Sequence, residues 1–355
     1  MTTISIGSAF ESSGSANNGF KSATFNKFVG LLDTYQAHAQ AKYEGAIYPS
    51  GTALAGQPYD PANGVVDRYA SEVMIPAFLE AYTGKKDLGL FPALTAILPN
   101  WNVTYSGLGK LAFMKRYFKS FNLNHGYKSL YSIGSYSSFS SYREYMGGIG
   151  FINDVATGNP IPSCPFDIST VSINEAFSPL IGVDMTFNNG MTAKVEYRKT
   201  RVVNLSMTAQ QINETCSNDF VIGMGYKIAD FKLFSPKRKV RKVKSRSTQR
   251  TEDGETKSSG SKTNANGFAQ SLNLRFDLSL RNQSAINRDI LTQRSEATSG
   301  NKALQISLPP DYALSKFIPL TAYYDRQFNE PLLTSSSYPT TTQDFGITMK
   351  FRLTR

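Results

Sequence analysis

The sequence predicts an all-β fold, an antiparallel transmembrane β-barrel segment with a helix-containing insertion, and three observations support this prediction. Apolar and polar residues alternate along several long segments, as they do in strands with two different faces. These segments exceed the roughly 5–6 residues usual in globular sheets, whereas a membrane-spanning strand needs about 9–11 residues. Charged residues make up only 18% of the 355-residue chain, below the roughly 25% typical of soluble domains.

The clearest alternation lies at the C-terminal end, where we expect a strand over 342–355. Every second residue is apolar and the intervening residues are mostly polar. Because successive side chains of a strand point to opposite faces, one face of this strand is apolar and the other polar. The apolar set is Phe345, Ile347, Met349, Phe351 and Leu353.

Four further segments carry the same pattern, at 121–135, 180–187, 219–229 and 268–281. In the segment 219–229 the apolar residues are Phe220, Ile222, Met224, Tyr226 and Ile228. In 268–281 they are Phe268, Leu272, Leu274, Phe276, Leu278 and Leu280. We expect about ten to twelve long strands in all, in the antiparallel arrangement of membrane barrels.

A tight hairpin is predicted between the strand 180–187 and a strand over 191–207. The connecting residues are Asn188, Asn189 and Gly190. Asn and Gly tolerate the positive φ angles that two-residue and three-residue hairpin turns require.

Two helical segments precede most of the strands. Apolar residues recur at helical spacing over 25–43, and a second helix is expected over 76–83, with Pro76 early in it and Gly84 at its end. We therefore interpret 1–10 as a strand of the barrel and 11–100 as a helix and loop excursion packed on or in the barrel, where it could narrow a pore. The range 101–355 would hold the C-terminal barrel strands.

The range 235–266 is expected to be a basic, disordered loop between two strands. Eight of the fifteen residues 236–250 are Lys or Arg, and a Ser-, Gly- and Asn-rich stretch follows them. A solvated loop is one interpretation, and contact with anionic lipid or protein is another. Nucleic acid is not an expected partner, because no aromatic residue lies among these charges and no nucleic-acid-binding motif accompanies them.

The net charge of the chain is +11. The sequence gives little support for an enzyme. No nucleophile elbow, P-loop, zinc-protease or dinucleotide motif is present. We expect His38 to be exposed on the first helix and His125 to be packed on a strand. Cys164 and Cys216 have no metal-binding spacing, and they are either two unrelated thiols or one disulfide. We accordingly predict no catalytic, cofactor-binding or metal-ligating residue, and no cofactor.

Several blocks of the sequence resemble, in the same order, the SprA/Sov family of Bacteroidetes, the outer-membrane translocon of type IX secretion. The blocks cover 71–84 (SEVMIPAFLEAYTG), 98–109 (LPNWNVTYSGLG), 119–136 (KSFNLNHGYKSLYSIGSY), 173–187 (INEAFSPLIGVDMTF), 191–203 (MTAKVEYRKTRVV), 220–226 (FVIGMGY), 311–331 (DYALSKFIPLTAYYDRQFNEP) and 338–355 (YPTTTQDFGITMKFRLTR). The first 70 residues match more weakly.

The resemblance implies the C-terminal portion of a very large barrel in the cell outer membrane, which exports folded cargo proteins and is linked to gliding motility. It implies as partners the outer-membrane lipid, secreted cargo, accessory barrel and plug proteins, and the remaining strands of the same barrel. This chain accounts for only part of such a barrel. Either it is a truncated product or the other strands are encoded separately.

Two other functions remain open on the sequence alone. One is a generic outer-membrane receptor or adhesin barrel that binds ligands through its loops. The other is a secreted β-sandwich, which the length of the strands disfavours.

The orientation in the membrane depends on the number of strands. If the C-terminus is periplasmic and 268–292 is one strand, the Asn188-Asn189-Gly190 hairpin and the basic loop are also periplasmic, where short turns are common. If 268–292 holds two strands, both assignments reverse.

Overall fold

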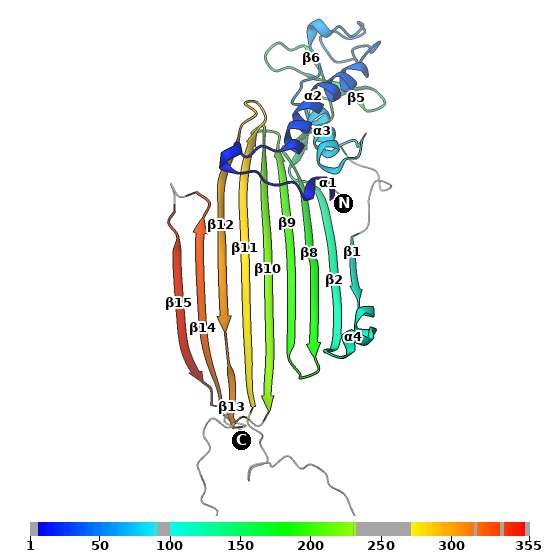
Figure 1. Ribbon diagram of the computed structural model, residues 1–355. Coiled ribbons are helices and arrows are strands. Elements are labelled where there is room, and N and C mark those ends of the chain that lie inside the picture. Colours follow the sequence, from blue (N-terminus) through cyan, green and yellow to red (C-terminus); the bar gives the residue numbers. More distant parts are fainter. Residues whose placement is uncertain are drawn as a thin grey trace, which may run out of the picture.

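The structure is a computed structural model that describes residues 6–86, 88–90, 100–229, 231, 271–315, 318–333 and 337–351. Most of these residues lie in strands, and a ten-stranded antiparallel sheet dominates the molecule (Figure 1). The expectation of an all-β protein with a helix-containing insertion is therefore confirmed.

The main sheet follows the order β1-β2-β8-β9-β10-β11-β12-β14, and β13 and β15 both pair with β14. Its strands are β1 (Trp101–Tyr105), β2 (Phe118–Ile133), β8 (Thr170–Phe187), β9 (Thr192–Ser206), β10 (Gln211–Ala229), β11 (Ser271–Asp289), β12 (Ser295–Leu308), β13 (Asp311–Ser315), β14 (Ile318–Pro331) and β15 (Thr340–Met349). Strands β8 to β12 are sequential neighbours, so the sheet is a meander with connections at alternating ends (Figure 1).

The long strands confirm the segments predicted from alternation and extend several of them. The strand expected over 219–229 begins earlier, at Gln211, and the one expected over 180–187 begins at Thr170. The range 268–292 holds a single strand, β11, in its described part. The last strand, β15, ends at Met349, and residues 352–355 lie outside the described residues.

The predicted hairpin joins β8 to β9. Gly190 has φ +85°, a left-handed conformation that glycine adopts without the steric cost of a side chain. The Gly190 amide donates to the Phe187 carbonyl at 3.0 Å, and the Met191 amide donates to Asn189 Oδ1 at 3.0 Å. The local chemistry of the turn thus fixes the register of β8 and β9.

A second unit, here called the cap, sits at one end of the sheet (Figure 1). It comprises residues 6–86 and 134–169. Its elements are α1 (Ile6–Ala9), η1 (Ala16–Asn18), α2 (Ala23–Ala41), η2 (Pro61–Asn63), α3 (Ser71–Thr83), a two-stranded sheet of β3 (Tyr136–Ser138) and β7 (Phe166–Ile168), and a three-stranded sheet of β4 (Arg143–Met146), β5 (Ile149–Asn153) and β6 (Pro160–Ser163). At the opposite end, η4 (Gly107–Lys110) and α4 (Ala112–Lys115) connect β1 to β2.

The core of the cap forms where α2 packs against α3. Phe28 and Phe78 contact each other edge to face with ring centroids 6.3 Å apart, and both are fully buried. The same apolar cluster includes Tyr131, Ile173 and Val203 from the main sheet. The cap is therefore joined to the sheet by a shared hydrophobic core.

Two sequence predictions within the cap are wrong. Residues 6–9 form a helical turn rather than a barrel strand, and residues 1–5 lie outside the described residues. Ala9 is buried against Tyr127 and Phe177, so this segment packs on top of the sheet instead of pairing within it.

The second helix begins at Ser71, five residues before Pro76, and not at the proline. Proline removes one helical hydrogen bond, but nearly every residue of α3 is buried. The packing energy of this helix outweighs the lost bond. Gly84, at φ +72°, ends the helix as predicted.

None of the helices in the described part of the chain has both the length and the apolar character needed to cross a membrane.

The described sheet is open. At one end β1 pairs only with β2, and at the other β15 pairs only with β14. In the described residues the outer edges of β1 and β15 therefore carry backbone groups without a partner strand.

Candidate functional site: the two faces of the sheet

The register of the strands sorts the side chains of the main sheet into two chemically different faces. On β10 and β11, Phe220 lies opposite Leu280, Ile222 opposite Leu278 and Met224 opposite Phe276. The same face continues onto neighbouring strands and forms what we call the apolar belt. The belt comprises Ile181, Val183, Val195, Tyr197, Phe220, Ile222, Met224, Tyr226, Ile228, Leu272, Leu274, Phe276, Leu278, Leu280, Leu304, Ile306, Phe328, Phe345, Ile347 and Met349.

The height of the apolar belt matches a hydrocarbon layer. From Phe220 to Ile228 the strand advances eight residues, or roughly 27 Å, close to the apolar band of about 25 Å on membrane barrels. Aromatic residues lie toward its two margins, Tyr197 and Phe328 at one and Tyr226 at the other. Arg326 on β14 interrupts the belt, opposite Ile306.

The apolar belt is accessible rather than buried. Leu280 is 43% exposed, and Phe345 and Ile347 on β15 are 84% and 74% exposed. Soluble monomers rarely present a continuous apolar surface of this extent. The belt therefore requires an apolar environment or partner.

The opposite face is polar along the full length of the same strands. On β11 it carries Asn273, Arg275, Asp277, Ser279 and Arg281. Its charges are neutralised locally, since Arg281 Nε lies 2.9 Å from Asp219 Oδ1 and Lys194 Nζ lies 2.7 Å from Glu196 Oε1. Such a face is suited to water and offers little apolar surface to a passing protein.

The cap covers the apolar side of the sheet at one end. The sheet residues in its core, Tyr131, Ile173 and Val203, share the face of the apolar belt, because the register pairs Tyr131 with Ile173 and Ile173 with Val203. The described cap thus lies on the apolar side of the sheet. It does not cover the polar face.

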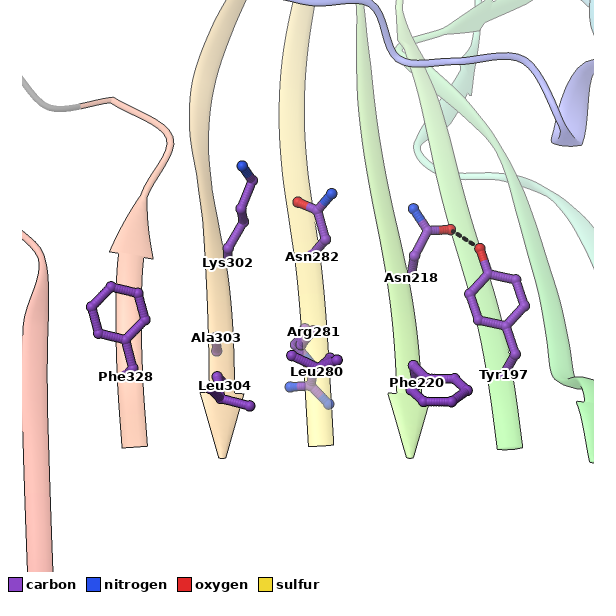
Figure 2. Close-up of a pocket in the computed structure, with 10 residues that line it drawn as sticks. All are labelled: Tyr197, Asn218, Phe220, Leu280, Arg281, Asn282, Lys302, Ala303, Leu304 and Phe328. Atoms are coloured by element: carbon purple, nitrogen blue, oxygen red, sulfur yellow. Dashed lines mark hydrogen bonds between the residues drawn. The ribbon is translucent and has the colours of Figure 1, made fainter. Parts of the chain in front are cut away.

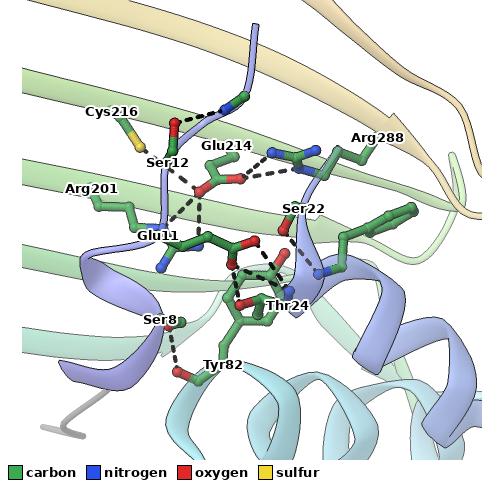
Figure 3. A network of polar contacts seen from close by, with 12 residues as sticks. Ser8, Glu11, Ser12, Ser22, Thr24, Tyr82, Arg201, Glu214, Cys216 and Arg288 are labelled. Carbon is green, nitrogen blue, oxygen red and sulfur yellow. Dashed lines mark hydrogen bonds and ion pairs between the residues drawn. The ribbon is translucent and has the colours of Figure 1, made fainter. Parts of the chain in front are cut away.

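A buried charged cluster joins the cap to the sheet (Figure 3). Glu214 on β10 accepts hydrogen bonds from Arg201 Nε at 2.8 Å and from Arg288 Nη2 at 3.0 Å. All three side chains are at most 5% exposed. Glu175 on β8 is also buried and lies directly opposite Arg201. The guanidinium groups of Arg201 and Arg288 lie over the aromatic rings of Tyr82 and Phe25, at 5.2 and 6.0 Å from the ring centroids.

An N-terminal segment, here called the strap (residues 10–22), crosses this cluster before entering α2 (Figure 3). Arg288 Nη1 donates to the Phe20 carbonyl. Glu11 accepts hydrogen bonds from the backbone amides of Ala23 and Thr24 at the start of α2, where a carboxylate is favoured by the helix dipole. Partial burial raises the pKa of Glu11, but the hydrogen bonds from Thr24, Ser22 and the two amides outweigh it and hold the pKa below its ordinary value.

The two histidines lie where the sequence predicted. His38 is exposed on α2. His125 is packed on β2, with Nδ1 2.7 Å from the Leu180 carbonyl oxygen and its ring 6.2 Å from that of Trp101.

The two cysteines are both free and buried, so the disulfide alternative is wrong. Cys164 lies in the cap, where its thiol donates to the Phe166 carbonyl at 3.1 Å. Cys216 lies on β10 near the buried charged cluster, with Sγ 3.8 Å from Glu214 Oε1.

The basic loop predicted over 235–266 lies outside the described residues. Within the described ranges, no group of three or more His, Cys, Asp or Glu residues could hold a metal ion.

Sequence reasoning missed the buried charged cluster. Arg201, Glu214 and Arg288 lie far apart in the chain, and only the register of β9, β10 and β11 brings them together. One sequence signal was available. Charged residues occupy positions that the alternation assigns to the apolar face, which indicates a covered region of that face.

No family model matches the sequence, and no curated protein matches it.

Proposed function

We propose that this chain is a wall segment of an outer-membrane, protein-conducting β-barrel, the C-terminal part of a type IX secretion translocon. The apolar belt would contact lipid, and the polar face would line a wide aqueous lumen through which folded cargo passes. The observation that carries the proposal is the two-faced open sheet, with an apolar band of about bilayer thickness on one side and a polar surface on the other.

The open edges support a segment of a larger structure rather than a complete one. Strands can cross a bilayer only in a closed barrel, because the membrane core offers no water to unpaired backbone groups. The outer edges of β1 and β15 would therefore pair with further strands of the same barrel. This agrees with the resemblance to a translocon whose barrel is several times larger than this sheet.

The polar face is consistent with cargo export. A folded protein moving past Ser279 and Asn273 meets hydrated side chains, and paired charges such as Arg281 with Asp219 hold no excess charge to trap it. A transport path with this lining would be tolerant of cargo sequence.

The connectivity bears on orientation. The β8–β9 hairpin, the end of β10 at Ala229, the start of β11 at Ser271 and the end of β15 all lie at the end of the sheet away from the cap (Figure 1). The connection between β10 and β11 therefore begins and ends there. With a periplasmic C-terminus, this end is periplasmic and the cap lies on the cell-surface side. Protease added to intact cells should then reach the cap and spare the connection over 230–270.

The lining of the lumen can be tested by cysteine accessibility. In a background with Cys164→Ser and Cys216→Ser, we expect Ser279→Cys on the polar face to react with a water-soluble maleimide in intact membranes. Leu278→Cys on the apolar belt should react only after the membrane is dissolved. Equal reaction at the two positions in intact membranes would contradict the proposal.

Export itself can be tested by placing apolar side chains on the polar face. Ser279 and Gln305 lie opposite each other on β11 and β12. We expect Ser279→Leu with Gln305→Leu to reduce the cargo released into the medium, while Leu278→Ile on the apolar belt leaves it unchanged. Normal export with the double variant at normal abundance would argue against cargo passage along this face.

A receptor or adhesin barrel remains the second candidate, since it would share the apolar belt. It predicts normal export with the double variant and a loss of ligand uptake or adhesion when the exposed loops are changed.

A further inference from the structure

A row of polar side chains borders the apolar belt on the side of the cap. Lys199, Asn218, Asn282 and Lys302 lie directly opposite one another on β9, β10, β11 and β12. They share the face of the apolar belt, two residues beyond Tyr197, Phe220, Leu280 and Leu304. The polar row therefore lies at the height where a hydrocarbon layer around the belt would end.

A groove opens on the apolar belt immediately below the polar row (Figure 2). It has a volume of about 380 Å³. Its floor and sides include Tyr197, Phe220, Leu280, Leu304 and Phe328, and Asn218, Asn282 and Lys302 stand at its upper rim. These five apolar residues form one row across the strands, directly below the polar row. A molecule with an apolar body and a polar head beside it fits this arrangement.

The charge around the rim favours an anion. Lys302 is exposed, and in the described residues it forms no hydrogen bond or ion pair. The cations near the rim on this face are Lys199, Arg201, Arg288 and Lys302, and the carboxylates are Glu175, Glu214 and Glu330. Glu175 is buried and lies directly opposite Arg201. Glu214 is paired with the two buried arginines. Glu330 on β14 lies opposite Lys302.

We propose that this groove and rim bind a phosphorylated lipid, with an acyl chain against the apolar residues of the groove and a phosphate at Lys302 and the amides of Asn218 and Asn282. Lys199 supports the same rim, since its Nζ donates to Asn218 Oδ1 at 3.3 Å and so orients the Asn218 amide group. Tyr197 donates to the same oxygen at 3.3 Å. The Asn218 NH₂ group is thereby left to donate to a phosphate oxygen.

This inference rests on the proposed function, because it places the apolar belt in the membrane. The complete barrel that contains this chain should be incorporated into nanodiscs with equal amounts of phosphatidylglycerol and phosphatidylcholine. Native mass spectrometry of the released protein then counts the lipids that remain bound. We expect the wild-type chain to retain phosphatidylglycerol in preference to phosphatidylcholine.

Three variants separate the site from general charge attraction. Lys302→Gln should weaken phosphatidylglycerol retention about fivefold, the value expected for one lysine at an anionic lipid surface. Adding Lys199→Gln should weaken it further. Lys227→Gln removes the same charge from β10 on the polar face, and it should leave retention unchanged.

The competing outcomes are distinct. Failure of the chain to co-purify with further barrel strands from the outer membrane would count against the proposed function itself. Entry into nanodiscs without a preference for phosphatidylglycerol, or an equal loss with Lys227→Gln, would overturn the lipid site alone. Displacement of the lipid by millimolar inorganic phosphate would show that the rim binds phosphate without help from the groove, and would also overturn it.

Discussion

Arg288 and Glu214 form a doubly hydrogen-bonded ion pair across β10 and β11, with Arg288 Nε and Nη2 donating to Glu214 Oε2 at 3.1 and 3.0 Å. Arg288 is fully buried, so no water can replace Glu214. Glu214→Gln should therefore destabilise the chain by about 3–5 kcal/mol, the cost of leaving a buried charge without its partner. Chemical denaturation in detergent would measure this loss.

Glu296→Gln is the control for this prediction, because Glu296 is exposed on β12. Its effect should stay within about 0.5 kcal/mol. If both variants unfold at the same denaturant concentration, the buried charged cluster does not hold the cap to the sheet.

Glu11 should make the stability of the strap depend on pH. Its folded-state pKa is lowered, so its contribution is present above the ordinary carboxyl pKa and is lost as pH falls through the folded-state value. At pH 7, Glu11→Gln should cost roughly 1 kcal/mol, as the loss of a helix cap does. The difference between the two proteins in denaturant unfolding should shrink at pH 3. A difference that is equal at both pH values would rule out the carboxylate as its source.

Cys164 should react slowly with alkylating reagents while the cap is folded. Burial raises the pKa of its thiol to about 11, and the thiolate is the reactive form. In a Cys216→Ser background, iodoacetamide at pH 8 should modify Cys164 at least about a hundredfold more slowly than it modifies the denatured chain. Rapid modification of the folded protein would show that the cap opens readily around this residue.

Two glycine substitutions should change stability in opposite directions. Gly190→Ala forces a side chain into the left-handed conformation of the β8–β9 turn and should destabilise by about 1 kcal/mol. Gly30→Ala lies at an exposed position of helix α2 with no atom near the added carbon, and it should stabilise by roughly 0.5–1 kcal/mol. Thermal unfolding of the two variants would measure both effects, and a shift of the same sign in both would contradict the assignment of these conformations.

The sequence predicted those parts of the fold that depend on local chemistry. The lower half of β10 alternates cleanly because one side faces the apolar belt and the other is polar, and the Asn188-Asn189-Gly190 turn follows from the φ angles its residues tolerate. The sequence prediction missed the first half of β10, over 211–218. There Ile212, Glu214 and Cys216 share a covered face, and Glu214 breaks the pattern because its partners come from other strands.

The predicted start of the second helix was wrong for a related reason. Pro76 is a local signal for a helix start, but α3 is buried on nearly all sides, and this tertiary packing carries the helix through the proline. The polar row at the rim of the groove also depends on register. Nothing in the sequence connects Lys199 with Lys302, and only three strand pairings align them in one row.

The contact between Phe20 and Arg288 has a consequence for the order of events during folding. It joins residues 268 positions apart, and closing so long a loop costs conformational entropy that local contacts cannot offset early on. Arg288 belongs to β11, and β11 joins the preceding strands of the sheet through its pairing with β10. The beginning of the chain therefore docks only after a late strand is in place. Before that moment the two arginines and Glu214 are open to water, and the docked strap marks a sheet that has been assembled through β11.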